Sequence, residues 1–292
     1  MGWLTSDDAG MFTIGSAYGE EAQADGNRSC EQGWQMRQAT GETVFGSCRA
    51  SRTMSMPRPD AETLAAQARQ VLAGRFQGVL STLSADMPGY PFGSVVPFCA
   101  GFDGAPVLLL SQLAHHTRNL LAQPRAALTL SDAADGDVPR SLRLTAVGEV
   151  LPIEEPAEAA GRYFRYFPES RDWFEHLDFR FFRFSPARWH FNGGFATARW
   201  FGNERILRPM LLSPAEESAL VGGFNRDALP ALTRVLAAAG LALDPADATR
   251  LCGLDGEGMD IAINHRLIRV AHREPVDSAA ALKALLHAVA AG

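Results

Sequence analysis

The sequence has 292 residues, of which 47% are hydrophobic and 21% are charged, with a formal net charge of −6 at pH 7. Such a composition is typical of a soluble globular protein, and the length suffices for one large domain or two ordinary ones. The acidic balance argues against a general nucleic-acid-binding protein, which would carry a basic surplus. Because Lys283 is the only lysine, a catalytic lysine and a phosphate-binding P-loop are excluded from the body of the chain.

The cysteines indicate a reducing compartment. There are four, Cys30, Cys48, Cys99 and Cys252, without a Cys-x-x-Cys pair or the spacing of a zinc site. We therefore expect a cytoplasmic protein without structural zinc. No apolar run approaches the roughly 20 residues that span a bilayer, and the N-terminus lacks the pattern of a signal peptide. No membrane partner is expected.

Residues 1–55 are polar, rich in glycine and without sustained hydrophobic periodicity. We interpret them as a disordered or mis-called N-terminal extension, with the true start at Met54 or Met56. A helix is predicted to follow, with Asp60 as its N-cap. Its apolar face comprises Leu64, Ala68, Val71 and Leu72.

The next segment is rich in strand patterns. Strands are predicted over residues 78–84, 92–102, 105–111, 125–131, 141–153, 178–186 and 188–201. Helices are expected only over 115–123 and 156–167. Many strands without a repeated βαβ unit predict an antiparallel β-barrel, which we place at residues 56–208.

A second unit is predicted over residues 209–292. It contains two helical stretches, at about 214–222 and 226–240, a strand pair joined at Asn264-His265, and a closing helix over 278–290. This pattern is typical of a small α+β domain that is long enough to fold alone.

Four polar residues between two apolar segments form a candidate anion site. His115, His116, Thr117 and Arg118 begin a predicted helix, and Ser111 ends the preceding strand. A helix N-terminus with an arginine and a hydroxyl suits a phosphate or carboxylate. Alternatively, Ser111 or His115 caps the helix and the stem of Arg118 covers apolar surface. The residues alone leave both readings open.

Several motifs carry a resemblance to a known family: "GVLSTLS" with "GYPFGSVVPF", "LAHHTRNL" before "PRAAL", "LRLTAVGEV", and "GGF" before "ARW". The stretch from about 60 to 205 resembles the FMN-binding split-barrel superfamily of pyridoxamine 5′-phosphate oxidase, and within it the HugZ/HutZ-type heme-utilisation proteins. The motifs "GLDGEGMDI" and "HRLIRVAHREPVDSAAAL" resemble the small α+β domain appended to such barrels.

The sequence departs from these families at several positions. The appended domain usually begins with His-Met-Asn and then Asp-His, whereas this chain has Phe224-Asn225 and Asp227-Ala228. The oxidases place Ser-Arg-Lys on the flavin phosphate, whereas this chain has His116-Thr117-Arg118. It also lacks the Arg-x-His-x-Arg element that holds the substrate of true oxidases, which makes vitamin B6 oxidation improbable.

The resemblance implies a cytoplasmic, homodimeric heme-binding protein for heme utilisation, with heme degradation left open. Ser111, His115, His116, Thr117, Arg118 and Gly194 would contact the cofactor, and His190 is the candidate axial heme ligand. His190 could equally be a packed residue beside Trp189 and Phe191. Arg162 and Arg165 could bind heme propionates or form a solvated stripe.

Two alternatives remain. The same anion site would suit the phosphate of FMN in an oxidoreductase. The protein could also be a non-enzymatic regulatory module whose appended domain binds a partner enzyme.

Overall fold

The structure is a computed structural model that describes residues 59–132, 141–194 and 197–291, and the backbone of four short strands before them. These strands pair in twos, β1 (Trp3–Ser6) with β2 (Phe12–Gly15) and β3 (Gln35–Arg37) with β4 (Thr43–Phe45). They belong to a unit over residues 1–56, separate from the unit over residues 57–292. The predicted N-terminal extension and the two proposed start residues fall largely outside the described residues.

The first helix of the larger unit is α1 (Ala61–Ala73), and it begins as the sequence predicts. The side chain of Asp60 accepts a hydrogen bond from the backbone N–H of Thr63 at 2.7 Å, which satisfies one donor of the first turn. The buried face is Leu64, Ala65, Ala68, Val71 and Leu72. This face packs into the main hydrophobic core.

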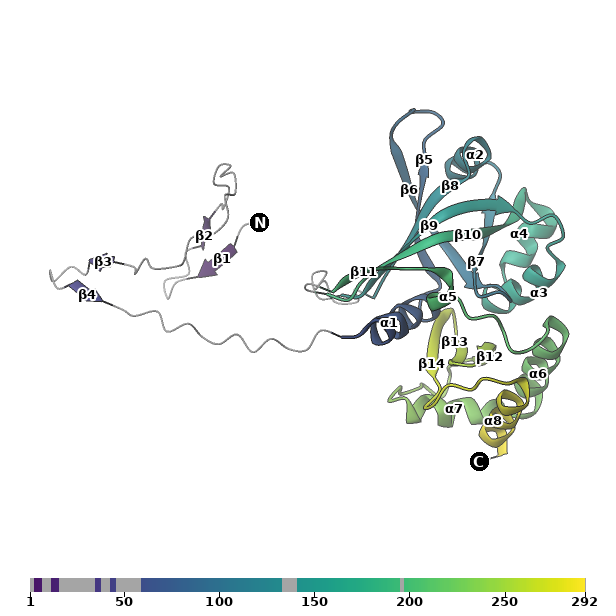
Figure 1. The fold of residues 1–292 in the computed structure, drawn as a ribbon. Coiled ribbons are helices and arrows are strands. Elements are labelled where there is room, and N and C mark those ends of the chain that lie inside the picture. Colours follow the sequence, from purple (N-terminus) through teal and green to yellow (C-terminus); the bar gives the residue numbers. More distant parts are fainter. Residues whose placement is uncertain are drawn as a thin grey trace. The chain divides into compact units, whose positions relative to one another are not determined.

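The central sheet has seven antiparallel strands, six of which close into a barrel because β9 also pairs with β10 (Figure 1). The seventh strand, β11, pairs with the end of β10. The strands are β5 (Gln77–Leu83), β6 (Pro91–Ala100), β7 (Pro106–Ser111), β8 (Arg125–Ser131), β9 (Arg143–Pro152), β10 (Phe179–Asn192) and β11 (Ala198–Phe201). The antiparallel split β-barrel with a following α+β unit, predicted from the sequence, is confirmed.

The strand β10 differs from the prediction because it is one continuous strand of 14 residues instead of two. It pairs with β7 near its start, with β9 along most of its length, and with β11 near its end. A register shift between Pro186 and Arg188 lets the strand pass a proline, which lacks the N–H needed for regular pairing. Gly148 of β9 lies opposite, and a Cβ there would overlap the backbone of Ser185.

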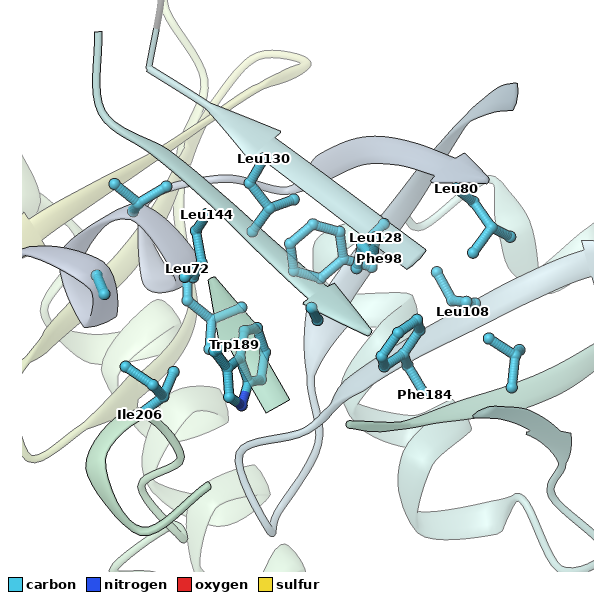
Figure 2. Packing of buried hydrophobic residues seen from close by; sticks show 14 of the residues in the cluster. Leu72, Leu80, Phe98, Leu108, Leu128, Leu130, Leu144, Phe184, Trp189 and Ile206 are labelled. Atoms are coloured by element: carbon cyan, nitrogen blue, oxygen red, sulfur yellow. The ribbon is translucent and has the colours of Figure 1, made fainter. Parts of the chain in front are cut away.

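The barrel interior is filled by large apolar side chains that come from α1, from all six barrel strands and from α5 (Asn203–Ile206) (Figure 2). Among them are Leu72, Leu80, Phe98, Leu108, Leu128, Leu130, Leu144, Phe184, Trp189 and Ile206. The indole N–H of Trp189 donates to the side-chain oxygen of Asn203 at 2.9 Å, so the largest buried ring has its polar atom satisfied. The barrel is therefore a packed core and not a channel.

Three further helices belong to the barrel segment. They are α2 (His115–Ala122), α3 (Ala157–Tyr166) and α4 (Ser170–His176). The sequence predicts α2 and α3. It does not predict α4, because a seven-residue helix without a side-chain N-cap is too short to show apolar periodicity.

The C-terminal segment folds into a three-stranded antiparallel sheet with three helices. Its elements are α6 (Pro214–Asp227), α7 (Leu229–Ala238), β12 (Thr249–Asp255), β13 (Gly258–Ile263), β14 (Arg266–Ala271) and α8 (Ala279–Ala291). The strand pair β13–β14 and the helices follow the prediction, whereas β12 was not expected. Its register shifts between Leu251 and Gly253, and this irregularity hides the alternating pattern of a strand.

The helix α3 joins the two sheets. Its residues Tyr163 and Tyr166 belong to a core cluster that also contains Cys99 and Phe181 of the barrel and Cys252 of β12. A buried polar network runs through the same region. In this network Arg162 donates to Glu217 of α6, to the carbonyl of Ala100 and to the hydroxyl of Tyr166, and that hydroxyl donates to Asp260 of β13. Burial raises the pKa of the Tyr166 hydroxyl, which therefore stays protonated.

The close approach of β9 and β10 at the bulge gives a testable prediction. In Gly148→Ala the new methyl group meets the Ser185–Pro186 backbone, which cannot move without opening the barrel seam. We expect the free energy of unfolding to fall by about 2 kcal/mol or more, measured by urea denaturation. The control is Gly161→Ala in α3, where a Cβ meets nothing within 4 Å. This control should be as stable as the parent or slightly more stable. Equal stability of the two variants would contradict the tight seam.

Candidate functional site

Three residues separate the end of β7 from the start of α2, whose N-cap is Ala114, without a side-chain hydrogen bond at the cap. The hydroxyl of Ser111 accepts the N–H of Leu113 at 3.2 Å, and the carbonyl of Ser111 accepts the N–H of Ala114 at 3.2 Å. The same carbonyl accepts the hydroxyl of the buried Thr117 at 2.6 Å. Neither Ser111 nor His115 therefore caps the helix, and Thr117 holds the turn that precedes it.

A buried asparagine fixes α2 against the barrel. The side-chain oxygen of Asn119 accepts the N–H of Ala85 at 2.9 Å, and its amide donates to the hydroxyl of Thr82 at 2.9 Å. These bonds tie the helix to β5 and to the loop that follows it. The first turn of α2 is thus held at a defined place beside the β5–β6 hairpin.

Three charged or titratable side chains meet at the exposed start of α2. The guanidinium of Arg118 lies 3.3 Å from the carboxylate of Asp86 and 2.7 Å from Nδ1 of His115, and that Nδ1 lies 3.2 Å from the same carboxylate. Since Nδ1 cannot accept from Arg118 and donate to Asp86 at once, the tautomer of His115 decides which bond forms. We call Asp86, His115 and Arg118 the α2 anion notch.

Asp86 was not found by sequence reasoning. It lies 32 residues before Arg118, in the loop between β5 and β6, and only the hairpin fold brings it to α2. The predicted strands at 78–84 and 92–102 leave residues 85–91 as a loop but do not indicate what this loop contacts. The notch therefore already contains one carboxylate, which is the type of group that the sequence predicted as its ligand.

His116 is half-buried on the other side of the α2 start. Its Nδ1 lies 3.1 Å from the hydroxyl of Ser94 on β6. Burial, and to a lesser extent the nearby His115, lowers the pKa of His116 below its usual value. His116 is therefore neutral at neutral pH and contributes a hydrogen-bonding group, without a formal charge, to this region.

His190 lies elsewhere, near the end of β10, where it pairs with Thr145 of β9 and Trp200 of β11. The rings of His190 and Trp200 are 4.9 Å apart. Gly194 follows the strand with φ of 99°, which only glycine adopts readily, and its N–H donates to the side chain of Asn192 at 3.1 Å. These residues form a second group of predicted site residues.

His190 belongs to a continuous row of side chains across the outside of the barrel. Successive members are paired residues of neighbouring strands, so the row crosses β6, β5, β8, β9, β10 and β11 in that order. We call it the outer-face row, and its members are Val95, Val79, Thr129, Thr145, His190 and Trp200. Its two ends are apolar and exposed, with Val95 at 68% and Trp200 at 46% exposure.

The α2 anion notch and His190 do not meet within one chain. The contact of His116 is to Ser94, whose side chain faces the opposite side of the sheet from its neighbour Val95 in the outer-face row. The predicted site residues therefore form two groups on different faces.

The two arginines of α3, and one further histidine in the barrel segment, also have contacts within the protein. Arg162 and Arg165 both pair with the buried Glu217, so they form neither a propionate site nor a solvated stripe. His176 is exposed at the end of α4, and its Nδ1 lies 3.3 Å from the carbonyl of Asp172. Within the described part of the chain, no group of three or more His, Cys, Asp or Glu side chains could hold a metal ion.

Comparison with known proteins now places the fold. The model of the CREG β-barrel family matches residues 59–205, which is half of the chain and contains the whole barrel. The chain belongs to the CREG β-barrel family. The match ends at α5, before the C-terminal sheet begins.

Individual relatives cover different parts of this CREG β-barrel protein. The chloroplastic heme oxygenase HOZ of Arabidopsis thaliana is 39% identical over 132 residues, which are 44% of this chain and 40% of HOZ. The match thus spans about two fifths of the length of that curated relative.

Two solved structures extend the comparison. A protein of unknown function from Agrobacterium tumefaciens has a TM-score of 0.64 at 23% identity, over 77% of this chain and 94% of that one. This likeness shows that the fold continues beyond the barrel. A heme-binding protein from Mycobacterium smegmatis has a TM-score of 0.46 at 25% identity, over 80% of this chain and 98% of that one. None of the helices that the structure describes has the length and apolar character to cross a membrane.

The lowered pKa of His116 predicts a pH dependence of stability. Because the unfolded chain binds a proton on this residue more readily than the folded one, protonation favours unfolding. Its contribution to stability is complete above the ordinary histidine pKa of about 6.5 and is lost as the pH falls below it. We expect the loss of stability between pH 8 and pH 5.5, measured by urea unfolding, to be smaller in His116→Gln than in the parent. An equal loss in both proteins would contradict this assignment.

Proposed function

We propose that this protein binds heme and acts in heme utilisation. The observation that carries the proposal is the combination of an exposed arginine, Arg118, at the start of α2 with 39% identity to a relative that is named a heme oxygenase. Heme, when bound, supplies an iron centre that can activate dioxygen. The chain would supply an anchor for the carboxylate groups, an axial nitrogen and a surface that excludes water.

The proposed carboxylate anchor is the α2 anion notch. Arg118 can donate two parallel hydrogen bonds to a carboxylate, and the N-terminal end of α2 adds the positive end of a helix dipole. The carboxylate of Asp86 accepts from Arg118 in the same way that a propionate would. The residues present therefore fit an acidic ligand group. Asp86 would compete with that group for the guanidinium of Arg118. Ser111 and Thr117 would fix the turn, and His116 would line it.

The proposed axial ligand is His190, and we propose that a second copy of the chain brings it near the notch. The outer-face row is apolar and exposed at both ends, which suits burial against an identical face about a two-fold axis. In such a homodimer, the notch of one subunit and His190 with Gly194 of the other would border one shared pocket. This arrangement explains why the two groups lie apart in a single chain.

The same notch also suits a phosphate, and this keeps an FMN-dependent oxidoreductase as the alternative. The two cofactors are distinguished by the spectrum of the purified protein, since bound flavin is yellow and bound hemin has a Soret band.

We further propose that residues 209–292 form an appended domain. The buried free thiols of Cys99 and Cys252 suit a reducing cytoplasm, where such thiols are stable.

Two substitutions in the α2 anion notch should change the affinity for hemin in opposite directions. Arg118→Gln removes the charged donor and should weaken hemin binding about tenfold or more, measured by titration of the Soret absorbance. Asp86→Asn removes the competing carboxylate and should strengthen hemin binding several-fold. His190→Ala should shift the Soret band.

The matched control for the notch is Arg171→Gln, which removes an exposed arginine whose partner is Glu175 on α4. It should leave hemin affinity unchanged. The heme proposal is abandoned if stoichiometric hemin gives no Soret band. Equal affinities of the Arg118 and Asp86 variants would remove the notch from the proposal while leaving heme binding in place.

The outer-face row gives a prediction for assembly. Val95→Glu places a charge on the apolar end of the row and should convert a dimer into a monomer, measured by light scattering after size-exclusion chromatography. Leu177→Glu is the control, since Leu177 is also exposed, at 58%, but lies outside the row at the end of α4. A parent protein that is monomeric, or a Val95 variant that remains dimeric, would contradict the proposed interface.

A further inference from the structure

A cavity of about 580 Å³ lies between the barrel and the C-terminal sheet, away from both groups of predicted site residues. One wall comes from the end of α1, with Leu72 and Ala73, from Ile206 at the end of α5, and from the segment that follows α5. The opposite wall comes from the turn between β12 and β13 and from residues 275–277. Its volume is within the range of pockets that bind small molecules, and junctions of this kind are frequent ligand sites.

The walls are held by close backbone contacts at two glycines. Gly104, in the turn between β6 and β7, has φ of 82°, and a Cβ on it would lie 2.7 Å from the carbonyl oxygen of Arg208. A Cβ on Gly256 would overlap the carbonyl of Val276. Hydrogen bonds reinforce both contacts, from Met210 N–H to Phe102 O and from Val276 N–H to Gly256 O, each at 2.8 Å. The cavity is therefore preformed.

Three arginines line the cavity, and two of them are already neutralised. Arg69 donates to Glu257 at 2.8 Å, and Arg269 donates to Asp260 at 2.9 Å and also pairs with Asp255. Arg208 is different, because one of its terminal nitrogens donates to the backbone carbonyls of Glu204 and Leu207, both at 3.1 Å. Across the described ranges, no carboxylate lies within ion-pair distance of Arg208. Its guanidinium thus retains donors for an anion.

The lining also contains two glycines and three carboxylates, of which Asp255 pairs with Arg269 and Glu257 with Arg69, while Asp277 is exposed. The other lining residues are leucine, isoleucine, valine, methionine, proline and alanine, without an aromatic ring among the described lining residues. A flat aromatic ligand gains part of its affinity from stacking on rings, which this cavity does not offer. A flexible aliphatic chain would bury its surface against these side chains without that requirement.

We propose that this cavity binds an aliphatic carboxylic acid, with its chain along Leu72, Ile206 and Leu211 and its carboxylate on Arg208. The site is independent of the heme proposal, because none of its residues belongs to the α2 anion notch or to the outer-face row. A ligand there contacts both the barrel and the C-terminal sheet, so it stabilises their junction. The protein would then bind a second class of ligand, an aliphatic acid, in addition to heme.

Isothermal titration of the full-length protein with sodium decanoate tests this site. We expect saturable binding of one decanoate per chain, and affinity about tenfold or more lower in Arg208→Gln, because a charged hydrogen bond is lost. Arg208→Lys should keep part of the affinity. Ala73→Phe fills the cavity and should abolish binding while hemin binding persists, which shows that this variant is folded.

Arg266→Gln, which removes an exposed arginine on β14 outside the cavity, is the matched control and should bind decanoate like the parent. The proposal is overturned by the absence of saturable decanoate binding, or by equal affinities of the Arg208→Gln and Arg266→Gln variants. Binding of 2-naphthoate as tight as that of decanoate would overturn the assignment to aliphatic acids. Hemin binding is measured on the same samples, so failure of this site and failure of the heme proposal are distinguished.

Discussion

The pairing of β10 with three other strands is the constraint on which the fold depends. This strand closes the barrel against β9, begins beside the end of β7 and ends beside β11. Its bulge at Pro186 requires the close approach that Gly148 allows. Because β10 starts next to Ser111 and ends just after His190, the same strand fixes where α2 leaves the barrel and where the outer-face row lies. The position of β10 therefore determines where the α2 anion notch and His190 lie.

The arginines differ in their hydrogen-bond and ion-pair partners, and these partners indicate different roles. Arg162 and Arg165 are held by Glu217 in the interior, where breaking a buried pair is costly, so their role is to join the barrel to the C-terminal sheet. Arg118 is exposed and shares a single carboxylate with His115. Such an exposed pair contributes little to stability, and its carboxylate can be replaced by that of a ligand. Among the described residues, the hydrogen-bond partners of Arg208 are backbone carbonyls, so an acid could bind it without displacing a carboxylate.

Local patterns in the sequence predict the parts of this fold that depend on local physics. Asp60 and the apolar face of α1, the barrel strands before β10, and the start of α2 at His115 were predicted correctly, whereas the boundaries of β10 and β11 were not. Three elements of the larger unit were missed: β12 because of its bulge, and α4 and α5 because they are too short to show apolar periodicity. Asp86 and the separation of His190 from α2 could not be predicted, since both depend on strand order. The arginines of α3 were misjudged because their partner Glu217 belongs to a distant helix.

The central claim is that α2 holds the acidic edge of a planar cofactor whose iron binds a histidine of the partner subunit. A crystal structure of the protein grown with hemin tests it most directly. The account predicts density for the macrocycle between two subunits, with a propionate on the guanidinium of Arg118 in place of Asp86 and with His190 of the other subunit on the iron. Density elsewhere, or propionates that leave the Arg118–Asp86 pair intact, would contradict it.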